Sequence, residues 1–277
     1  MSTALILSSF VAANRIGGGA QQIALTALGI EAHLVPTTIL GRNPARGASG
    51  QATAPELFQG MVDDVAAEGL FARIDLVITG YFASAEQVRI AAATLARLRA
   101  ANSNLVTVVD PILGDHPKGL YLPAEVAASM AAALVPAADW ITPNAWELAH
   151  LTGRAVESAE AAAAAARTLG GRALVSSIPA GAGEIGLVLC DGANACLYAH
   201  PRREQAPNGA GDLVTAVFAA GLVQGLTPDA AAAAATAAAA HMIDAAAEMG
   251  DLPLAQLVQA LRQPVAGLRM APFGEPA

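Results

Sequence analysis

Short apolar runs of strand length alternate along most of the chain with longer segments of helical composition. The runs lie at residues 4–7, 32–35, 76–79, 106–109, 140–141 and 173–176. The segments between and after them predict helices at 20–28, 57–68, 85–101, 123–134, 146–152 and 159–169. Apolar strands that alternate with helices are typical of a parallel sheet whose two faces are both covered. We therefore predict an α/β fold with a mostly parallel central sheet.

The last third of the chain departs from this alternation. Residues 186–190 and 195–198 predict a hairpin around Asp191-Gly192, and the chain from Leu213 onward has a helical pattern. Residues 181–186 match the letters of a dinucleotide-binding fingerprint, but a strand and a turn follow them instead of a helix. We therefore expect a hairpin loop there and no dinucleotide site.

One long segment, residues 42–54, has the proline and glycine content of a loop. We expect this segment to form a mobile flap. Because the chain shows neither an internal repeat nor a linker rich in proline or serine, residues 1–277 are expected to form a single domain.

Composition narrows the classes of partner. The net charge is −8 without a lysine and arginine cluster, which argues against nucleic acid. The alanine-rich stretch 229–240 is too short and too weakly apolar to span a membrane, so a packed helix of small side chains is expected. Cys190 and Cys196 are expected to be thiols rather than a disulfide or a metal site. The N-terminus lacks a secretory pattern, so the cytoplasm is the expected compartment.

The most informative motif is the turn Asn208-Gly209-Ala210-Gly211-Asp212, which opens directly into a helix. A helix N-terminus presents unpaired N–H groups and the positive end of the peptide dipole, and both favour an anion. The two glycines let the backbone approach that anion closely. Asp212 follows in the first turn as a proton acceptor, which predicts phosphoryl transfer to a hydroxyl. The structural alternative is that Asp212 only caps the helix.

Polar residues also follow three of the predicted strands. Asp110 follows 106–109, Thr142 and Asn144 follow 140–141, and Ser177 follows 173–176. Because ligands gather at the carboxyl ends of parallel strands, these residues are expected to line one site. Their oxygen atoms suit Mg²⁺. Asn144 and Glu147 also have the spacing of a helix capping box, a structural role that can coexist with metal binding.

Taken in order, these motifs resemble the ribokinase-like superfamily and, within its vitamin-kinase branch, the pyridoxal kinases. The resemblance is carried by Asp110-Pro111 with Gly114-Asp115, by Thr142-Pro143-Asn144 with Glu147, and by Gly209-Ala210-Gly211-Asp212. Further matches are Lys118-Gly119-Leu120-Tyr121, Gly80-Tyr81, Ser9 and Pro36-Thr37-Thr38. The resemblance extends over residues 4–225.

The resemblance implies a three-layer α/β/α sandwich and a homodimer that phosphorylates the 5′-hydroxymethyl group of pyridoxal with ATP and Mg²⁺. It implies that Asp212 takes the hydroxyl proton, while the amides of Gly209, Ala210 and Gly211 hold the transferring phosphoryl group. Metal and phosphates are then organised by Asp110, Thr142 and Glu147, with support from Asn144. Nucleotide contacts are also implied for Ser176 and Ser177, and contacts with the pyridine ring for Ser9 and Tyr81.

Three departures from the family pattern lie on the substrate side. Phe10 stands where many pyridoxal kinases have histidine, Arg42-Asn43-Pro44-Ala45 replaces a Ser-Asn-His-Thr run, and residues 14–19 differ as well. We therefore expect Phe10 and Ala45 to decide which substrate is bound. The alternatives are another small-alcohol kinase, such as a hydroxymethylpyrimidine kinase, or a catalytically silent protein that binds a vitamin or a nucleotide.

Overall fold

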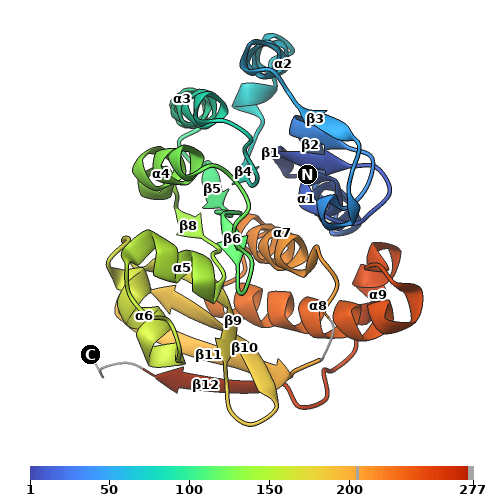
Figure 1. The fold of residues 1–277 in the computed structure, drawn as a ribbon, viewed down its shortest axis with the longest axis vertical. Coiled ribbons are helices and arrows are strands. Elements are labelled where there is room, and N and C mark those ends of the chain that lie inside the picture. The colour runs from blue at the N-terminus through green and yellow to red at the C-terminus, as the bar shows by residue number, and fades with distance from the viewer. Residues whose placement is uncertain (204–205, 274–277) are drawn as a thin grey trace.

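A ten-stranded sheet forms the middle layer of the molecule (Figure 1). The computed structural model describes residues 1–203 and 206–273. Along the sheet the strands lie in the order β12-β11-β10-β9-β8-β5-β4-β1-β2-β3. Their bounds are Thr3–Val11 (β1), Glu31–Leu40 (β2), Gly50–Ala52 (β3), Leu76–Thr79 (β4), Val106–Val109 (β5), Trp140–Ile141 (β8), Arg172–Pro179 (β9), Glu184–Asp191 (β10), Asn194–Pro201 (β11) and Arg269–Phe273 (β12).

Six neighbouring strands, from β9 to β2, run parallel to one another. On one side β10, β11 and β12 extend the sheet with antiparallel pairing, and on the other side β3 pairs antiparallel with β2. Every strand that the sequence pattern predicts is present, including the hairpin of β10 and β11, which closes at the Asp191–Asn194 pair. The prediction of a mostly parallel α/β sheet is confirmed.

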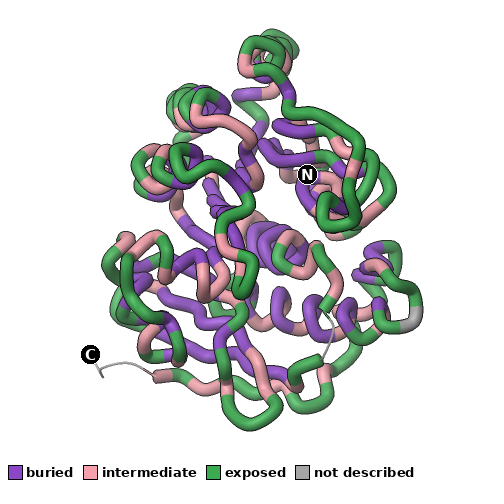
Figure 2. Tube along the Cα trace, viewed as in Figure 1, coloured by how far each residue is buried: buried purple, intermediate pink, exposed green. Residues whose placement is uncertain are grey.

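The strands are buried on both faces because helices cover both. In β1, Leu5 and Leu7 join one apolar cluster, whereas Ala4 and Ile6 join a second cluster on the opposite face. Figures 1 and 2 show α2 to α6 along one face, α1, α7, α8 and α9 along the other, and mostly buried strands between them. The helices are Gly17–Ala27 (α1), Pro55–Ala67 (α2), Ala85–Ala101 (α3), Ala124–Ala133 (α4), Ala145–Thr152 (α5), Ala159–Arg167 (α6), Ala210–Val223 (α7), Pro228–Met249 (α8) and Leu257–Ala260 (α9).

Helix α8 contains the alanine-rich stretch and is longer than the sequence pattern suggested. Its segment Pro228–Ala247 is long and apolar enough to cross a membrane by length and composition, but 56% of that window is buried inside the fold. Small side chains let α8 pack closely on α7: a Cβ added at Gly221 would lie 2.8 Å from the Cβ of Ala231. Packing in the core therefore accounts for the composition of α8, as expected of a helix of small side chains.

Three parts of the secondary structure differ from the sequence-based expectation. The chain after Leu213 is not helical throughout, because Arg269–Phe273 forms β12 and pairs with β11 at the sheet edge. Residues 42–54 are not purely loop either. A short 3-10 helix, η1 (Pro44–Arg46), and the strand β3 lie within them. A two-stranded hairpin of β6 (Gly114–Asp115) and β7 (Gly119–Leu120) was also missed. These strands are too short to produce an alternation that the sequence could display.

Packing between α7 and the sheet can be tested at Phe218. This fully buried side chain meets Trp140 edge to face, with ring centroids 5.2 Å apart. We expect Phe218→Ala to lower the free energy of unfolding by about 3–5 kcal/mol, because it leaves a cavity in a packed core. Urea denaturation checks this. The control Leu57→Ala removes a side chain that is 59% exposed and should change the value by less than about 0.5 kcal/mol. Similar losses in both variants would contradict the packing argument.

Candidate active site

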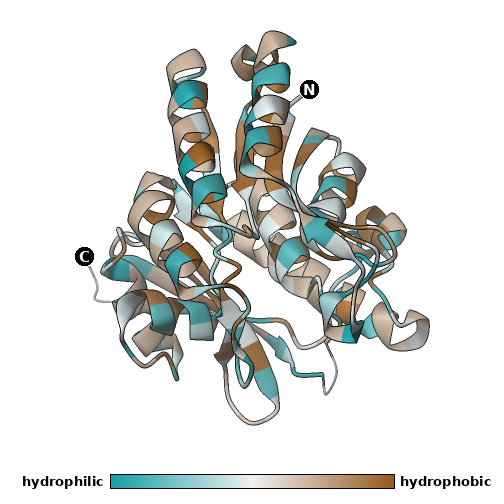
Figure 3. Ribbon diagram, turned by 45° about the horizontal axis from the view of Figure 1, so that its top comes forward, coloured by the Kyte–Doolittle hydropathy of each residue, from teal (hydrophilic) through white to brown (hydrophobic). Residues whose placement is uncertain are grey.

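Most of the candidate site residues lie at one edge of the sheet, where the parallel strands end. Asp110 directly follows β5, Thr142 directly follows β8, and Tyr81 lies two residues beyond β4. Ser9 lies near the end of β1, and Ser177 near the end of β9. In the view of Figure 3 the strands are mainly brown and apolar, which places the polar chemistry on the loops that leave them. This is the edge at which ligands bind in open α/β sheets.

The glycine turn forms the start of α7, as the sequence predicts. Gly209 is the residue that caps the helix, with a left-handed φ of 98°, and Asp212 lies in the first turn. A Cβ at residue 209 would overlap the carbonyl oxygen of Arg15, so only glycine fits there. A Cβ at residue 211 would meet nothing within 4 Å. The amide of Gly211 therefore borders open space at the positive end of the helix dipole.

Asp212 has one carboxylate oxygen bound and one left over. Its Oδ2 accepts the N–H of Gly17 at 2.8 Å. Its Oδ1 is buried and has no hydrogen-bond partner within residues 1–203 and 206–273. Burial raises the pKa of Asp212 to about 6, while the Gly17 N–H bond acts to lower it. The second oxygen is thus a proton acceptor whose pKa lies close to neutral pH.

Gly17, which binds Asp212, also packs against Ser9 near the end of β1. It has a left-handed φ of 66°, and a Cβ there would overlap the hydroxyl oxygen of Ser9. Ser9 is therefore adjacent to the residue that binds Asp212. Gly18 also lies where a Cβ would meet another residue, the side chain of Leu34. The hydrogen bond from Gly17 to Asp212 had no signal in the sequence.

The backbone of Tyr81 is held beside the same strand end. Its N–H donates to Ser8 Oγ at 3.3 Å, and its carbonyl accepts the Thr37 hydroxyl at 2.6 Å. These two bonds attach the end of β4 to β1 and β2. The backbone of Tyr81 therefore lies beside Ser8, the neighbour of Ser9 in β1, and contact of Tyr81 or Ser9 with a substrate stays a prediction.

Asp110 and Thr142 are joined through Thr215, a residue that sequence reasoning missed. Thr215 Oγ1 donates to Asp110 Oδ2 at 2.9 Å and lies 2.8 Å from Thr142 Oγ1. While Asp110 is ionised, it takes the Thr215 proton, and the Thr142 hydroxyl is then the donor to Thr215. Thr142 then keeps only lone pairs, which suit a cation better than a phosphate. Thr215 could have been found as a hydroxyl one turn after Asp212 in an otherwise apolar helix.

Glu147 and Asn144 form the capping box at the start of α5. Asn144 Oδ1 accepts the N–H of Glu147 at 2.9 Å, and Glu147 Oε2 accepts the N–H of Asn144 at 2.8 Å. Glu147 Oε1 also accepts the N–H of Leu113 at 2.9 Å. The structural interpretation of this pair is confirmed. Glu147 also positions the segment after β5, while its contact with a metal stays a prediction.

The buried carboxylates of this edge fit a bound cation. Burial first, and then the charges of Glu147 and Asp212, raise the pKa of Asp110 well above its usual range. Burial likewise raises the pKa of Glu147 to about 8. A nearby positive charge would relieve this repulsion. No three acidic, histidine or cysteine side chains of the described residues group into a metal site. Mg²⁺ takes one or two carboxylates and completes its shell with water and phosphate oxygens, and its binding here stays a prediction.

Ser176 and Ser177 form an irregularity in β9. The pairing with β10 shifts between Gly186 and Val188, so both serines lie opposite one residue of the partner strand. Ser177 has a φ of 63°, the one left-handed non-glycine residue in the described chain. Backbone strain of this kind gathers at functional sites. Ser176 also forms a bridge with Asn144, which places the serines beside the end of β8. Their contact with a nucleotide stays a prediction.

Phe10 and Ala45 lie farther out than the other predicted residues. Phe10 is 38% exposed and pairs in register with Ile39 of β2. Ala45 is exposed in η1, where its N–H donates to Asn43 Oδ1 at 2.9 Å. No hydrogen bond joins either residue to Asp212 in the described chain. Their part in substrate choice stays a prediction.

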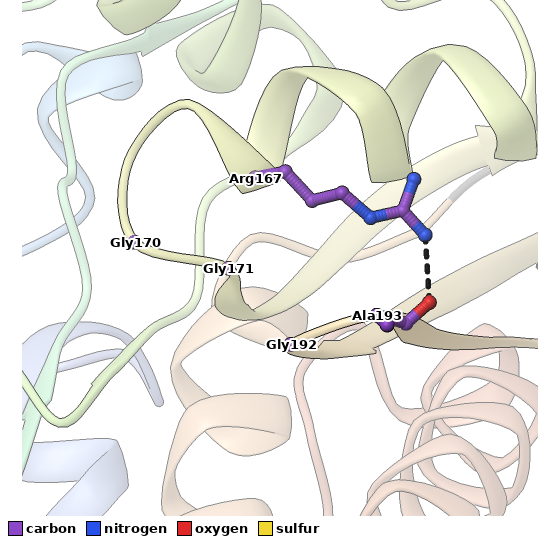
Figure 4. Close-up of a pocket in the computed structure, with 5 residues that line it drawn as sticks. All are labelled: Arg167, Gly170, Gly171, Gly192 and Ala193. Carbon is purple, nitrogen blue, oxygen red and sulfur yellow. Dashed lines mark hydrogen bonds between the residues drawn. The ribbon is translucent and has the colours of Figure 1, made fainter. Parts of the chain in front are cut away.

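One hollow in the structure lies away from this site. It measures about 610 Å³ and is bordered by Arg167, Gly170, Gly171, Gly192 and Ala193 (Figure 4). The Arg167 guanidinium spans it to the carbonyl of Ala193 at 2.9 Å. Gly171 precedes β9, so the hollow borders the opposite end of that strand from Ser177. It takes no part in the chemistry described above.

A proton acceptor beside a glycine turn at a helix N-terminus, on the carboxyl edge of this sandwich, defines a small-molecule kinase of the ribokinase-like class. Comparison with known proteins agrees with the geometry. The family model described as phosphomethylpyrimidine kinase matches residues 17–255. The chain belongs to this family.

Several kinases are similar to this chain. A pyridoxine/pyridoxal/pyridoxamine kinase of Bordetella avium is 33% identical over 227 residues, which cover 79% of this chain and 77% of that protein. A pyridoxal kinase of Deinococcus radiodurans is 30% identical over 228 residues, covering 77% and 76%. The crystal structure of a pyridoxal kinase from Entamoeba histolytica superposes with a TM-score of 0.90 at 26% identity, covering 99% of this chain and 100% of that one.

The two glycines of the turn should respond differently to a methyl group. We expect Gly209→Ala to lower the free energy of unfolding by about 1–3 kcal/mol, because residue 209 has a left-handed φ and abuts the Arg15 carbonyl. Gly211→Ala should leave stability within about 1 kcal/mol, since its Cβ meets no protein atom. It should instead raise the KM for the phosphate donor about tenfold by crowding the amide. Unfolding curves and initial rates measure both. Unchanged kinetics in Gly211→Ala would contradict a phosphate position there.

Proposed function

We propose that this protein transfers the γ-phosphoryl group of ATP to the 5′-hydroxymethyl group of pyridoxal. One observation carries the proposal: Asp212 keeps a buried, unpartnered carboxylate oxygen in the first turn of the helix that the glycine turn opens. The kinases similar to this chain are named for pyridoxal and its relatives, which supports the choice of alcohol.

Each residue of the turn has a separate task in this proposal. The amides of Gly209, Ala210 and Gly211 bind the charge that develops on the transferring phosphoryl group. Asp212 Oδ1 accepts the proton of the attacking hydroxyl, while the Gly17 N–H keeps Oδ2 in place. Burial matters for both tasks, because hydrogen bonds and charges act more strongly where water is excluded.

In this proposal Asp110 and Thr142 would hold Mg²⁺. Glu147 would act indirectly, because its carboxylate holds the segment after β5 in position. Mg²⁺ held by Asp110 and Thr142 would supply positive charge that offsets the negative charge of the phosphate groups. Thr142 offers lone pairs because its proton is donated to Thr215. Glu147 already accepts backbone N–H groups with both oxygens, so we assign it the indirect role. Ser176, Ser177 and Asn144 are placed on the nucleotide side.

A hydroxymethylpyrimidine kinase is the second candidate. It is favoured by the description of the matching family model and by the substrate-side departures at Phe10 and Pro44-Ala45. Both alcohols present a hydroxymethyl group on a flat nitrogen ring, so the phosphate side of the site would serve either. Ser9, Phe10, Tyr81 and Ala45 would decide between them. A homodimer in the cytoplasm remains the expected state, and the two cysteines, which are free and buried, agree with that compartment.

The role of Asp212 can be tested by removing its charge. We expect Asp212→Asn to lower kcat about a thousandfold while the fold persists, because the amide keeps the shape of the side chain but accepts no proton. In the unchanged protein, kcat/KM should fall as the pH drops through about 6, where Asp212 becomes protonated. Steady-state rates between pH 5 and 8 measure both effects.

A matched substitution controls for the loss of a carboxylate. Asp191→Asn lies at the turn of the β10–β11 hairpin, on the opposite edge of the sheet, and should leave kcat and the pH profile unchanged. Turnover of Asp212→Asn near that of the unchanged protein would refute the mechanism.

A substrate panel tests the proposed alcohol. We expect ADP release with pyridoxal at a kcat/KM at least tenfold above that with hydroxymethylpyrimidine, measured with pyridoxine and pyridoxamine in the same assay. The reverse order would assign the second candidate. Ligand-dependent thermal stabilisation without ADP release for any of the four would instead show a catalytically silent binding protein.

A further inference from the structure

Residues 12–16, between β1 and α1, are attached to the base of the flap. Ala13 donates its N–H to the carbonyl of Gly41 at 3.0 Å, which continues the pairing of β1 with β2. The next residue, Asn14, accepts the N–H of Asn43 on its Oδ1 at 2.9 Å. Asn43 is only 7% exposed. The side chain of Asn14 therefore holds the chain at the point where residues 42–54 leave the sheet.

The side chain of Asn43 in turn holds the start of η1 in position. Its Oδ1 accepts the N–H of Ala45 at 2.9 Å and so caps the short helix Pro44–Arg46. Ala45 is the flap residue at which substrate choice is expected. A shift of Asn14 would consequently move the start of η1 together with it.

The same loop is attached on its other side to the end of α8. The N–H of Arg15 donates to both carboxylate oxygens of Asp251, at 3.0 and 3.3 Å. Asn14 Nδ2 lies 3.5 Å from Asp251 Oδ2. Asp251 is oriented in turn by the N–H of Leu252, which donates to its Oδ1 at 2.9 Å. One carboxylate thus fixes two successive residues of the loop.

The loop then meets the catalytic turn at two points. The carbonyl of Arg15 packs against Gly209, where no Cβ fits. Two residues later the N–H of Gly17 binds Asp212 Oδ2 at 2.8 Å. Only two residues, Arg15 and Ile16, lie between the flap contact at Asn14 and the Asp212 contact at Gly17. A segment this short, pinned at both ends, cannot shift at one end without shifting at the other.

We infer that Asn14 is a positioning residue, which couples the placement of the 42–54 flap to the orientation of Asp212. Asp251 is the anchor that makes this coupling stiff. The inference rests on the proposed function for its kinetic consequence, since that function makes Asp212 the proton acceptor and the flap a substrate contact. The coupling itself is a property of the free chain.

Asn14→Ala tests the inference in two measurements. Deuterium exchange of the free, full-length protein should rise both in residues 42–54 and in residues 12–17, because one side chain holds both. In steady-state assays the kcat/KM for the alcohol should fall about tenfold, with a lower kcat, because the base is misplaced. The KM for ATP should stay within about twofold, since Asn14 contacts no residue placed on the nucleotide side.

Asn102→Ala is a matched control. Asn102 also accepts a backbone N–H on Oδ1, from Asn104 at 3.0 Å, and donates from Nδ2 to the carbonyl of Ile74 at 3.0 Å. It lies after α3, before β5 begins, on the edge of the sheet away from the site. This variant removes the same groups and should change neither the exchange of residues 12–17 and 42–54 nor kcat.

Substitutions of the anchor give an independent test. Asp251→Ala should reproduce the exchange and kinetic changes of Asn14→Ala, and Asp251→Asn, which keeps one acceptor oxygen, should restore most of the lost kcat. The double variant Asn14→Ala with Asp251→Ala should lose less than the product of the two single effects, because both act through one path.

The possible results distinguish a failure of the coupling from a failure of the proposed function. Exchange that rises in residues 42–54 alone, or kinetics equal to those of Asn102→Ala, would overturn the coupling. If the exchange results hold but neither alcohol is phosphorylated, then the proposed function fails while the coupling stands.

Discussion

The hydrogen bond from the Gly17 N–H to Asp212 Oδ2 is the contact on which the site depends. It spans 195 positions of the chain and joins the first crossover of the sheet to the start of α7. The contact needs glycine at residue 17, because Ser9 occupies the space of a side chain, and glycine at 209, because Arg15 does. Since one oxygen is bound in this way, the other is left with a defined position and no partner.

Burying the carboxylates of Asp110, Glu147 and Asp212 lowers the stability of the folded state. Burial raises the pKa values of Asp110, Glu147 and Asp212, which means that the folded state disfavours their charged forms. Glu147 recovers part of this cost through backbone N–H groups, and Asp110 through the Thr215 hydroxyl. Asp212 has a single such bond. In the proposed function, this uncompensated negative charge is what would attract a cation and accept a proton.

Several parts of the fold and the site could be predicted from the sequence, for local reasons. The strands of the parallel core are buried on both faces, so their apolar runs stand out. The capping box of Asn144 and Glu147 and the start of α7 at the glycine turn depend on residues a few positions apart. Strands β3, β6 and β7 were not predictable, because two or three residues are too few to show an alternation. Strand β12 was missed because it exists through pairing with β11, a distant segment of the chain. Thr215 and Gly17 were missed for the same reason: their partners are 105 and 195 positions away.

By itself, the sequence indicated the class of chemistry, because a glycine turn followed by a carboxylate at a helix N-terminus is a pattern of neighbouring residues. It also determined the order of the strand ends that carry the polar residues. Only the tertiary structure decided which oxygen of Asp212 has no partner among the described residues, that the hydroxyls of Thr142 and Thr215 meet, and that Asn14 binds both Asn43 and Asp251. These are consequences of hydrogen bonds between segments far apart in the chain, and such bonds leave no periodic or local trace in the order of residues.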